Sequence, residues 1–192
     1  MAFWTPIPAN LEHIGVDPAL FGEIRNPDEP ATDAKVADKK WKHLEEIPWF
    51  HAIPDGWPSN IGPGAVDSKT VAVAAATSGA MRVILPSVPE RIPSGLWCYR
   101  VSRDQCIVGG ALNDVGRAVT WLERTIIKPE NLDEVLIREP LEGTPAVLPF
   151  FSGERSIGWA ASAQATITNI QEQTGPEHLW RGVFEALALS YQ

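Results

Sequence analysis

Between residues 71 and 110 the hydrophobic pattern predicts four strands. The run VAVAAATSG (71–79) consists almost entirely of small apolar residues and stops at a glycine, and MRVIL (81–85) follows after a tight connection. Such a pair is typical of buried strands that flank a turn. The segments LWCYRV (96–101) and QCIVGG (105–110) predict two further strands, joined as a hairpin by the residues SRD.

After the last of these strands the apolar residues recur with a period of 3.6, which predicts a helix that runs to about residue 125. Its apolar face is formed by Val115, Val119 and Leu122. Asn113 or Asp114 is the expected N-cap, because both side chains accept hydrogen bonds from the first helical N–H groups.

Two more helices are predicted toward the C-terminus, over residues 130–139 and from Pro176 onward. Thr174 is the candidate cap of the last helix, since proline in its first turn is typical of a helix start. Strands followed by helices predict a layered α/β or α+β domain.

The first third of the sequence is richer in proline than the rest. Nine of the 17 prolines lie in residues 1–63, where they bound two expected helical stretches, 10–25 and 32–46. The charged residues of the second stretch are expected to form a solvated helix face. This part of the chain is too interrupted to bury a core of its own.

Charge and composition exclude several classes of function. The 192 residues contain 16 Lys plus Arg and 24 Asp plus Glu, a formal net charge of −8. Nucleic-acid binding needs a basic surface that follows phosphates, so we expect no nucleic-acid partner. No apolar run approaches the roughly 18 residues that cross a bilayer, and no signal-peptide pattern is present, so we expect a cytoplasmic protein without a membrane partner.

The two cysteines, Cys98 and Cys106, have a spacing that fits neither a zinc site nor a thioredoxin-type pair. We therefore expect ordinary buried thiols and no metal site built by the protein.

One glycine-containing segment precedes the first predicted strand, and a second forms the turn between the first two strands. In IPDGWPSNIGPGA (53–65), Asp55 stands directly before Gly56. A tight turn exposes a carboxylate suited to a general base, although a turn aspartate needs no chemistry. In ATSGAMR (76–82), the turn offers N–H groups and the hydroxyls of Thr77 and Ser78, which can cradle a phosphate or simply close a hairpin.

Two further segments combine glycine with polar side chains. GGALNDVGRAVTW (109–121) places a glycine pair between a strand end and a helix start, the geometry in which a helix N-terminus meets an anion. PFFSGERSIGW (149–159) joins aromatic residues to the neighbouring Glu154 and Arg155, for which an ion pair that orders a loop is the expected role.

Taken in order, the four segments resemble the FGGY carbohydrate kinases, ATP-dependent sugar kinases of the actin-like, ribonuclease H-like superfamily. PDGWPSNIGPG resembles the turn that carries the catalytic aspartate of this family, and ATSGAMRV looks like the phosphate loop of its gluconate kinase-like members. GGALNDVGRAVTW is similar to the segment that approaches ATP, LPFFSGERSIGW to the signature loop, and EHLWRGVFEALAL to the helix after that loop.

The resemblance implies an α/β fold of the ribonuclease H-like type and a role for particular residues. Asp55 would take the proton from the attacking hydroxyl, and Asp55 and Gly56 would contact the sugar. ATP and Mg²⁺ are the implied cofactors. The implied nucleotide-binding residues are Thr77, Ser78, Gly79, Gly110, Gly116 and Thr120.

The resemblance covers only part of a whole kinase of this family. Residues 1–64 would be a proline-rich linking segment that ends in the catalytic turn, and residues 65–192 an incomplete C-terminal nucleotide-binding domain. The N-terminal kinase domain, which binds most of the sugar, would be the missing partner. The expected substrate is a sugar or sugar acid, such as gluconate or a ketopentose.

A different class of function stays open beside the kinase fragment, namely a truncated, non-catalytic relative that acts as a binding or structural subunit. Ala76 replaces a glycine of the family's phosphate loop, and Ile157 replaces a common proline of its signature loop. The eight tryptophans would support association, including a homo-oligomer, if several were exposed. Packing in the core is the other explanation for them.

Overall fold

The computed structural model describes residues 13–17, 20, 25–31, 39–139 and 141–192. The chain forms two compact units, which are described separately. The first contains residues 1–55 with 101–103, and the second contains residues 56–100 with 104–192.

The described part of the first unit contains a 3-10 helix, η2 (Lys39–Leu44), and a turn that begins at Asn26. Glu29 accepts hydrogen bonds from the backbone N–H and the side-chain amide of Asn26, both at 3.1 Å. The backbone N–H of Asn26, followed by its amide and by Arg103, lowers the pKa of Glu29. The sequence predicts two helical stretches in this part of the chain. Where the stretch 32–46 is described, it forms only the short 3-10 helix η2. Most of the stretch 10–25 lies outside the described residues.

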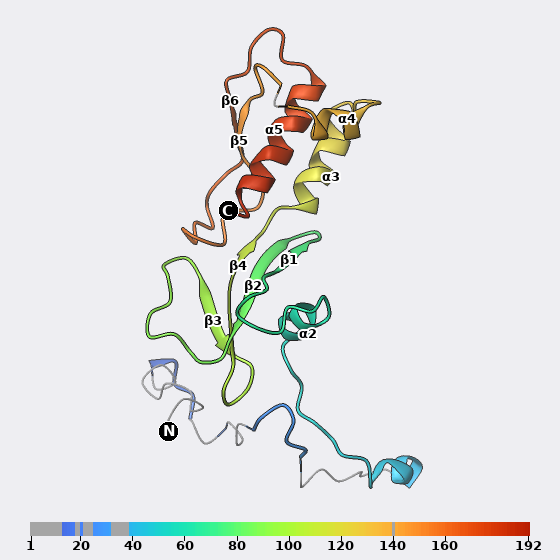
Figure 1. Ribbon diagram of the computed structural model, residues 1–192, viewed down its shortest axis with the longest axis vertical. Helices are drawn as coiled ribbons and strands as arrows, with labels where there is room; N and C mark the ends of the chain where they lie inside the picture. The colour runs from blue at the N-terminus through green and yellow to red at the C-terminus, as the bar shows by residue number, and fades with distance from the viewer. Residues whose placement is uncertain (1–12, 18–19, 21–24, 32–38, 140) are drawn as a thin grey trace. The chain divides into compact units, whose positions relative to one another are not determined.

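The second unit is built on a four-stranded antiparallel sheet (Figure 1). Its strands are β1 (Ala72–Ala75), β2 (Gly79–Leu85), β3 (Trp97–Arg100) and β4 (Cys106–Leu112), in the order β1-β2-β4-β3. The register places Ala75 opposite Gly79 and Cys98 opposite Val108. The four predicted strands and both predicted hairpins are therefore confirmed, as is the α/β class, with an antiparallel sheet.

The two faces of this sheet are covered differently. Ala72, Ala80 and Ile84 are buried on the face against which the short helix α2 (Gly56–Ile61) packs. On the other face, Val73 of the edge strand β1 is 59% exposed. The prediction that both strands of the first hairpin are buried is wrong for β1, because an edge strand has a neighbour on one side only.

The rest of the second unit is a helical layer with a small two-stranded sheet. Its elements are α3 (Gly116–Thr125), α4 (Leu132–Ile137), β5 (Ala146–Leu148), β6 (Thr166–Thr168) and α5 (Pro176–Leu189). Helix α5 lies between β5 on one side and α3 with α4 on the other (Figure 1). The core of this layer is formed by Ala118, Leu122, Leu132, Trp180, Val183 and Leu187.

Both predicted helix caps are wrong, although the helices themselves are confirmed. Val115 is the N-cap of α3, and no side chain bonds to the helix start there. Gly175 is the N-cap of α5, and its N–H donates to His178 Nδ1 at 3.2 Å. Thr174 instead accepts a hydrogen bond from the Gln171 N–H at 2.9 Å.

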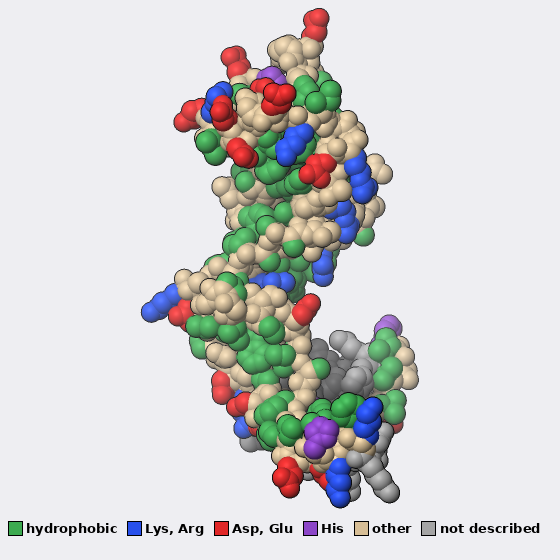
Figure 2. Space-filling model, turned by 90° about the vertical axis from the view of Figure 1, so that its right-hand side faces the viewer, with side chains coloured by type: hydrophobic (Ala, Val, Ile, Leu, Met, Phe, Trp, Pro, Cys, Tyr) green, Lys and Arg blue, Asp and Glu red, His purple; other side chains and the backbone are tan. Residues whose placement is uncertain are grey.

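The surface of the described residues carries scattered apolar side chains, and several acidic ones lie near the top of the view in Figure 2. Trp41, Trp49 and Trp159 are exposed, whereas Trp180 is buried. Trp180 is therefore a core residue, whereas association through the exposed tryptophans stays a prediction. In the described part of the chain, no helix is long and apolar enough to span a membrane.

Candidate functional site

The turn between β1 and β2 presents polar groups to solvent. Thr77 and Ser78 are exposed, and the Ala76 N–H donates to the Ser78 carbonyl at 2.9 Å, which closes the turn. Among the described residues, neither hydroxyl has a hydrogen-bond partner. The turn therefore offers two hydroxyls to a ligand that approaches from solvent.

The start of α3 is docked onto this turn. The N–H groups of Val115 and Arg117 donate to the Thr77 carbonyl, both at 3.3 Å, and the Gly116 N–H donates to the Ala76 carbonyl at 2.8 Å. These are groups that a helix start usually offers to an anion, and the role of Gly116 at a nucleotide stays a prediction. Here the same donors fix the turn.

Gly116 and Gly79 permit this close approach. A Cβ on Gly116 would lie 2.7 Å from the Ala76 carbonyl oxygen, and one on Gly79 would lie 2.7 Å from Val115 Cγ2. Tyr191, which the sequence did not single out, also packs against Gly79 and donates its hydroxyl to the Ala74 carbonyl at 2.8 Å. Burial raises the pKa of Tyr191, which keeps this hydroxyl a donor.

The structure brings together four of the expected nucleotide residues and places two elsewhere. Thr77, Ser78, Gly79 and Gly116 meet at the turn. Thr120 is one helical turn further along α3 and is half-buried. Gly110 lies in the middle of β4, where a Cβ would be 3.3 Å from Leu96 and 3.4 Å from Ser156.

Asp55 and Gly56 adjoin a unit boundary. Asp55 is exposed, in a turn directly before α2, and is the last residue of the first unit. Gly56 begins α2 in the second unit and is buried. An exposed carboxylate at a helix start is compatible with the expected role of a base.

The loop after β5 is attached to the start of α3 by side chains. The carboxylate of Asp114, 4% exposed, accepts the backbone N–H and the hydroxyl of Ser152, both at 2.7 Å. The amide of Asn113 donates to the carbonyls of Ser152 and Gly153 at 3.0 and 3.2 Å. The two residues expected to cap α3 therefore fasten this loop instead.

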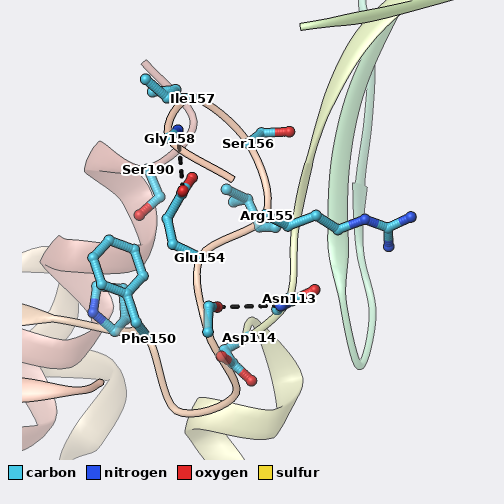
Figure 3. A pocket seen from close by; sticks show the side chains of 12 residues that line it. Asn113, Asp114, Phe150, Glu154, Arg155, Ser156, Ile157, Gly158 and Ser190 are labelled. Carbon is cyan, nitrogen blue, oxygen red and sulfur yellow. Dashed lines mark hydrogen bonds between the residues drawn. The ribbon is translucent and has the colours of Figure 1, made fainter. Parts of the chain in front are cut away.

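A cavity of about 360 Å³ lies between this loop, the end of β4 and Ser190 (Figure 3). Glu154 turns back along the loop and accepts the N–H groups of Gly158 and Ala160 at 3.0 and 3.2 Å. Arg155 extends away from Glu154, and within the described ranges it makes no ion pair (Figure 3). The predicted Glu154–Arg155 pair is wrong, because the carboxylate orders the loop through backbone N–H groups.

The same loop contains a strained residue. Ile157 has φ 97°, a conformation that a β-branched side chain rarely adopts. Gly95 packs directly against its backbone, and the neighbouring Ser156 hydroxyl accepts the Ala111 N–H at 2.6 Å. The loop is thus held rigidly from both sides, which is how such strain persists.

No metal centre is built by the described residues, in which no three His, Cys, Asp or Glu side chains cluster. Cys98 and Cys106 are free thiols, and Cys106 is buried.

Comparison with known proteins identifies relatives for most of the chain. The sequence family described as "FGGY family of carbohydrate kinases, C-terminal domain" matches residues 74–192. The gluconokinase of Bacillus subtilis (strain 168) is 24% identical over 156 residues, which cover 74% of this chain and 30% of that protein. This chain thus spans about a third of the length of its curated relatives.

Solved structures of sugar kinases share the fold. A gluconate kinase from Lactobacillus acidophilus has a TM-score of 0.81 at 24% identity and covers 95% of this chain and 38% of its own. A ligand-bound xylulose kinase from the same organism has a TM-score of 0.79 at 24% identity, with 92% and 37% covered.

Proposed function

Since the chain belongs to the FGGY family of carbohydrate kinases, we propose that it is part of an ATP-dependent kinase that phosphorylates a sugar or sugar acid. The transferred group is the γ-phosphoryl of ATP, and the acceptor is a hydroxyl of a gluconate-like or ketopentose-like substrate. Gluconate and xylulose are the substrates in the names of the relatives.

The observation that carries the proposal is the turn at residues 76–79. Two exposed hydroxyls, of Thr77 and Ser78, stand on a turn whose carbonyls are fixed by the start of α3. Phosphoryl transfer depends mainly on positioning and on charge stabilisation, so a rigid turn with hydroxyl donors suits the phosphates of ATP. Thr77, Ser78 and Gly79 would contact them, with Gly116 and Thr120 along the adjoining helix. Gly110, which lies in β4 and away from this turn, would also contribute to nucleotide binding.

In this proposal Asp55 is the general base, and Asp55 and the neighbouring Gly56 contact the sugar. The carboxylate accepts the proton of the attacking hydroxyl as the new O–P bond forms and ADP leaves. Mg²⁺ would neutralise charge on the ATP phosphates and would keep several waters, so it would need few protein ligands. We assign it no protein ligand.

The experiment is a kinase assay on the full protein that carries this sequence. ADP release is measured with gluconate, xylulose and glycerol as acceptors. Asp55→Asn should lower turnover at least roughly a hundredfold, the usual contribution of a general base. Asp67→Asn is the matched control, because Asp67 is also an exposed turn aspartate and accepts the Lys69 N–H at 2.9 Å.

Turnover that is unchanged in Asp55→Asn contradicts the role of Asp55. Absence of ADP release with every acceptor contradicts the kinase itself and favours the non-catalytic subunit.

A further inference from the structure

Arg82, in the middle of β2, is a half-buried cation. Its Nε is buried, and no described residue forms a hydrogen bond with it. In the part of the chain that the structure describes, Arg82 makes no hydrogen bond and no ion pair. The rest of the guanidinium is reached by solvent, since the residue as a whole is only half-buried.

Two glycines make room for this side chain. Arg82 is paired with Gly109 of β4, and a Cβ on Gly109 would lie 3.1 Å from Arg82 Cγ. A Cβ on Gly56 would lie 3.5 Å from Arg82 Nε. The stem of Arg82 therefore crosses β4 at Gly109, and its head lies beside the first residue of α2.

Aromatic residues enclose the same place. The rings of Trp97 and Tyr99 are stacked, with centroids 5.1 Å apart. Trp97 packs against Gly109, where a Cβ would lie 2.9 Å from Trp97 Cη2, and the Tyr99 hydroxyl packs against Gly56. These neighbours are aromatic rings and glycine backbone, which carry no negative charge.

A guanidinium stays protonated at any ordinary pH, so burying part of it without a partner is costly. Buried charges in proteins are usually paired, and an unsatisfied one calls for an explanation such as a bound water, ion or ligand. A planar guanidinium fits a carboxylate or a phosphoryl group through two parallel hydrogen bonds.

We propose that Arg82 binds an oxyanion beside the start of α2. The inference rests on the proposed function, because Gly56 directly follows Asp55 in the chain. The oxyanion is accordingly the carboxylate of a sugar acid or a phosphoryl group of the nucleotide.

The test is a titration of the 192-residue chain, followed by NMR at the arginine Nε–Hε groups. The probes are inorganic phosphate, gluconate and, as an uncharged control, glucose. The Arg82 resonance, assigned by its loss in Arg82→Lys, should shift in a saturable manner with phosphate or gluconate and not with glucose. A response to phosphate alone identifies the phosphoryl source, and a response to gluconate alone identifies the carboxylate.

Variants give the second measurement. Arg82→Gln should weaken binding of the responding anion by roughly tenfold or more, as expected for hydrogen bonds to a charged group. Arg124→Gln, at an exposed arginine in the last turn of α3, should leave it unchanged. Equal binding by Arg82→Gln and wild type, or no shift of the Arg82 resonance with either anion, overturns the inference. The wild-type titration decides the matter even if Arg82→Gln fails to fold.

The two proposals fail in different ways. If Asp55→Asn abolishes turnover while the Arg82 signal never responds, the kinase stands and the anion site falls. If the signal responds but no acceptor is phosphorylated, the anion site stands and the kinase falls.

Discussion

Asp114 and Ser152, 38 residues apart in the sequence, are joined by two hydrogen bonds of 2.7 Å. The Ser152 N–H and hydroxyl both donate to one buried carboxylate, and Arg117 Nη1 donates to the same hydroxyl at 2.8 Å. This contact ties the loop that contains Ile157 to the start of α3, the helix that also fixes the turn at Thr77.

Asp114→Asn should destabilise the protein by about 2 kcal/mol, because hydrogen bonds to a charged group contribute about 1.5–3 kcal/mol. The amide also turns an N–H₂ group toward the Ser152 donors. Urea unfolding measures the change in the free energy of unfolding. Asp104→Asn, at an exposed aspartate, serves as the control and should change it by less than about 0.5 kcal/mol. Equal effects of the two substitutions would show that the Asp114–Ser152 contact contributes little.

Gly116→Ala tests the docking of α3 on the turn. Alanine is favoured over glycine inside a helix by about 1 kcal/mol, yet its Cβ would lie 2.7 Å from the Ala76 oxygen. We expect the clash to dominate, with a net loss of about 1–2 kcal/mol in unfolding free energy.

Gly175→Ala is the matched control for this substitution. A Cβ there meets only His178 Nδ1, at 3.9 Å, so no clash is expected. Because alanine is a poorer N-cap than glycine, a loss of up to about 1 kcal/mol should remain. A stabilised Gly116→Ala protein would show that the turn moves away from the helix without cost.

Arg181 provides a third test, in the core of the helical layer. Its Nη1 donates to the carbonyls of Val135, Leu136 and Arg138 at 2.8–2.9 Å, which satisfies the C-terminal end of α4. Its Nε is bonded to Glu185. Arg181→Met should therefore lower the free energy of unfolding by at least about 2 kcal/mol.

The control for Arg181 is Arg138→Met, which breaks an exposed pair with Glu134 whose side chains are 61% and 60% exposed. Exposed pairs four residues apart contribute only about 0.3–0.5 kcal/mol. If the two variants melt alike, the buried arginine is not the stabilising group that its contacts indicate.

The strands and helices could be predicted because their patterns are local. A short apolar run that stops at a glycine, or a period of 3.6 residues, identifies an element without knowledge of its neighbours. The helix caps could not be predicted in this way. Asp114 accepts a hydrogen bond from a loop residue 38 positions away, and only the folded chain brings that residue close. The Glu154–Arg155 pair failed for the same reason: adjacency in sequence did not point the two side chains toward each other (Figure 3).

The candidate site was predictable in part. The turn at Thr77 and Ser78 follows from a strand, a glycine and a second strand in sequence. Arg82 lies in the same motif, but its lack of a partner depends on Gly109 and Gly56, which come from distant segments.

Cys106 should make the free energy of unfolding depend on pH above about pH 9. Burial, with the Cys98 thiol beside it, raises the pKa of Cys106 from 9.0 to about 11. Folding therefore favours the neutral thiol, and this contribution is complete below pH 9 and disappears as the pH rises through 11. The unfolding free energy of the wild type should fall over that range more steeply than that of Cys106→Ala. Parallel pH profiles would contradict the shift.

In the proposed kinase, the phosphates of ATP bind at the turn of residues 76–79. The direct measurement is a titration of the ¹⁵N-labelled chain with MgATP, followed at the backbone amides. We predict saturable shifts that are largest at Thr77, Ser78 and Gly79, smaller along α3, and absent at α4. Shifts confined to other parts of the chain, or no shift at the turn at millimolar MgATP, would contradict the proposal that this turn holds the nucleotide.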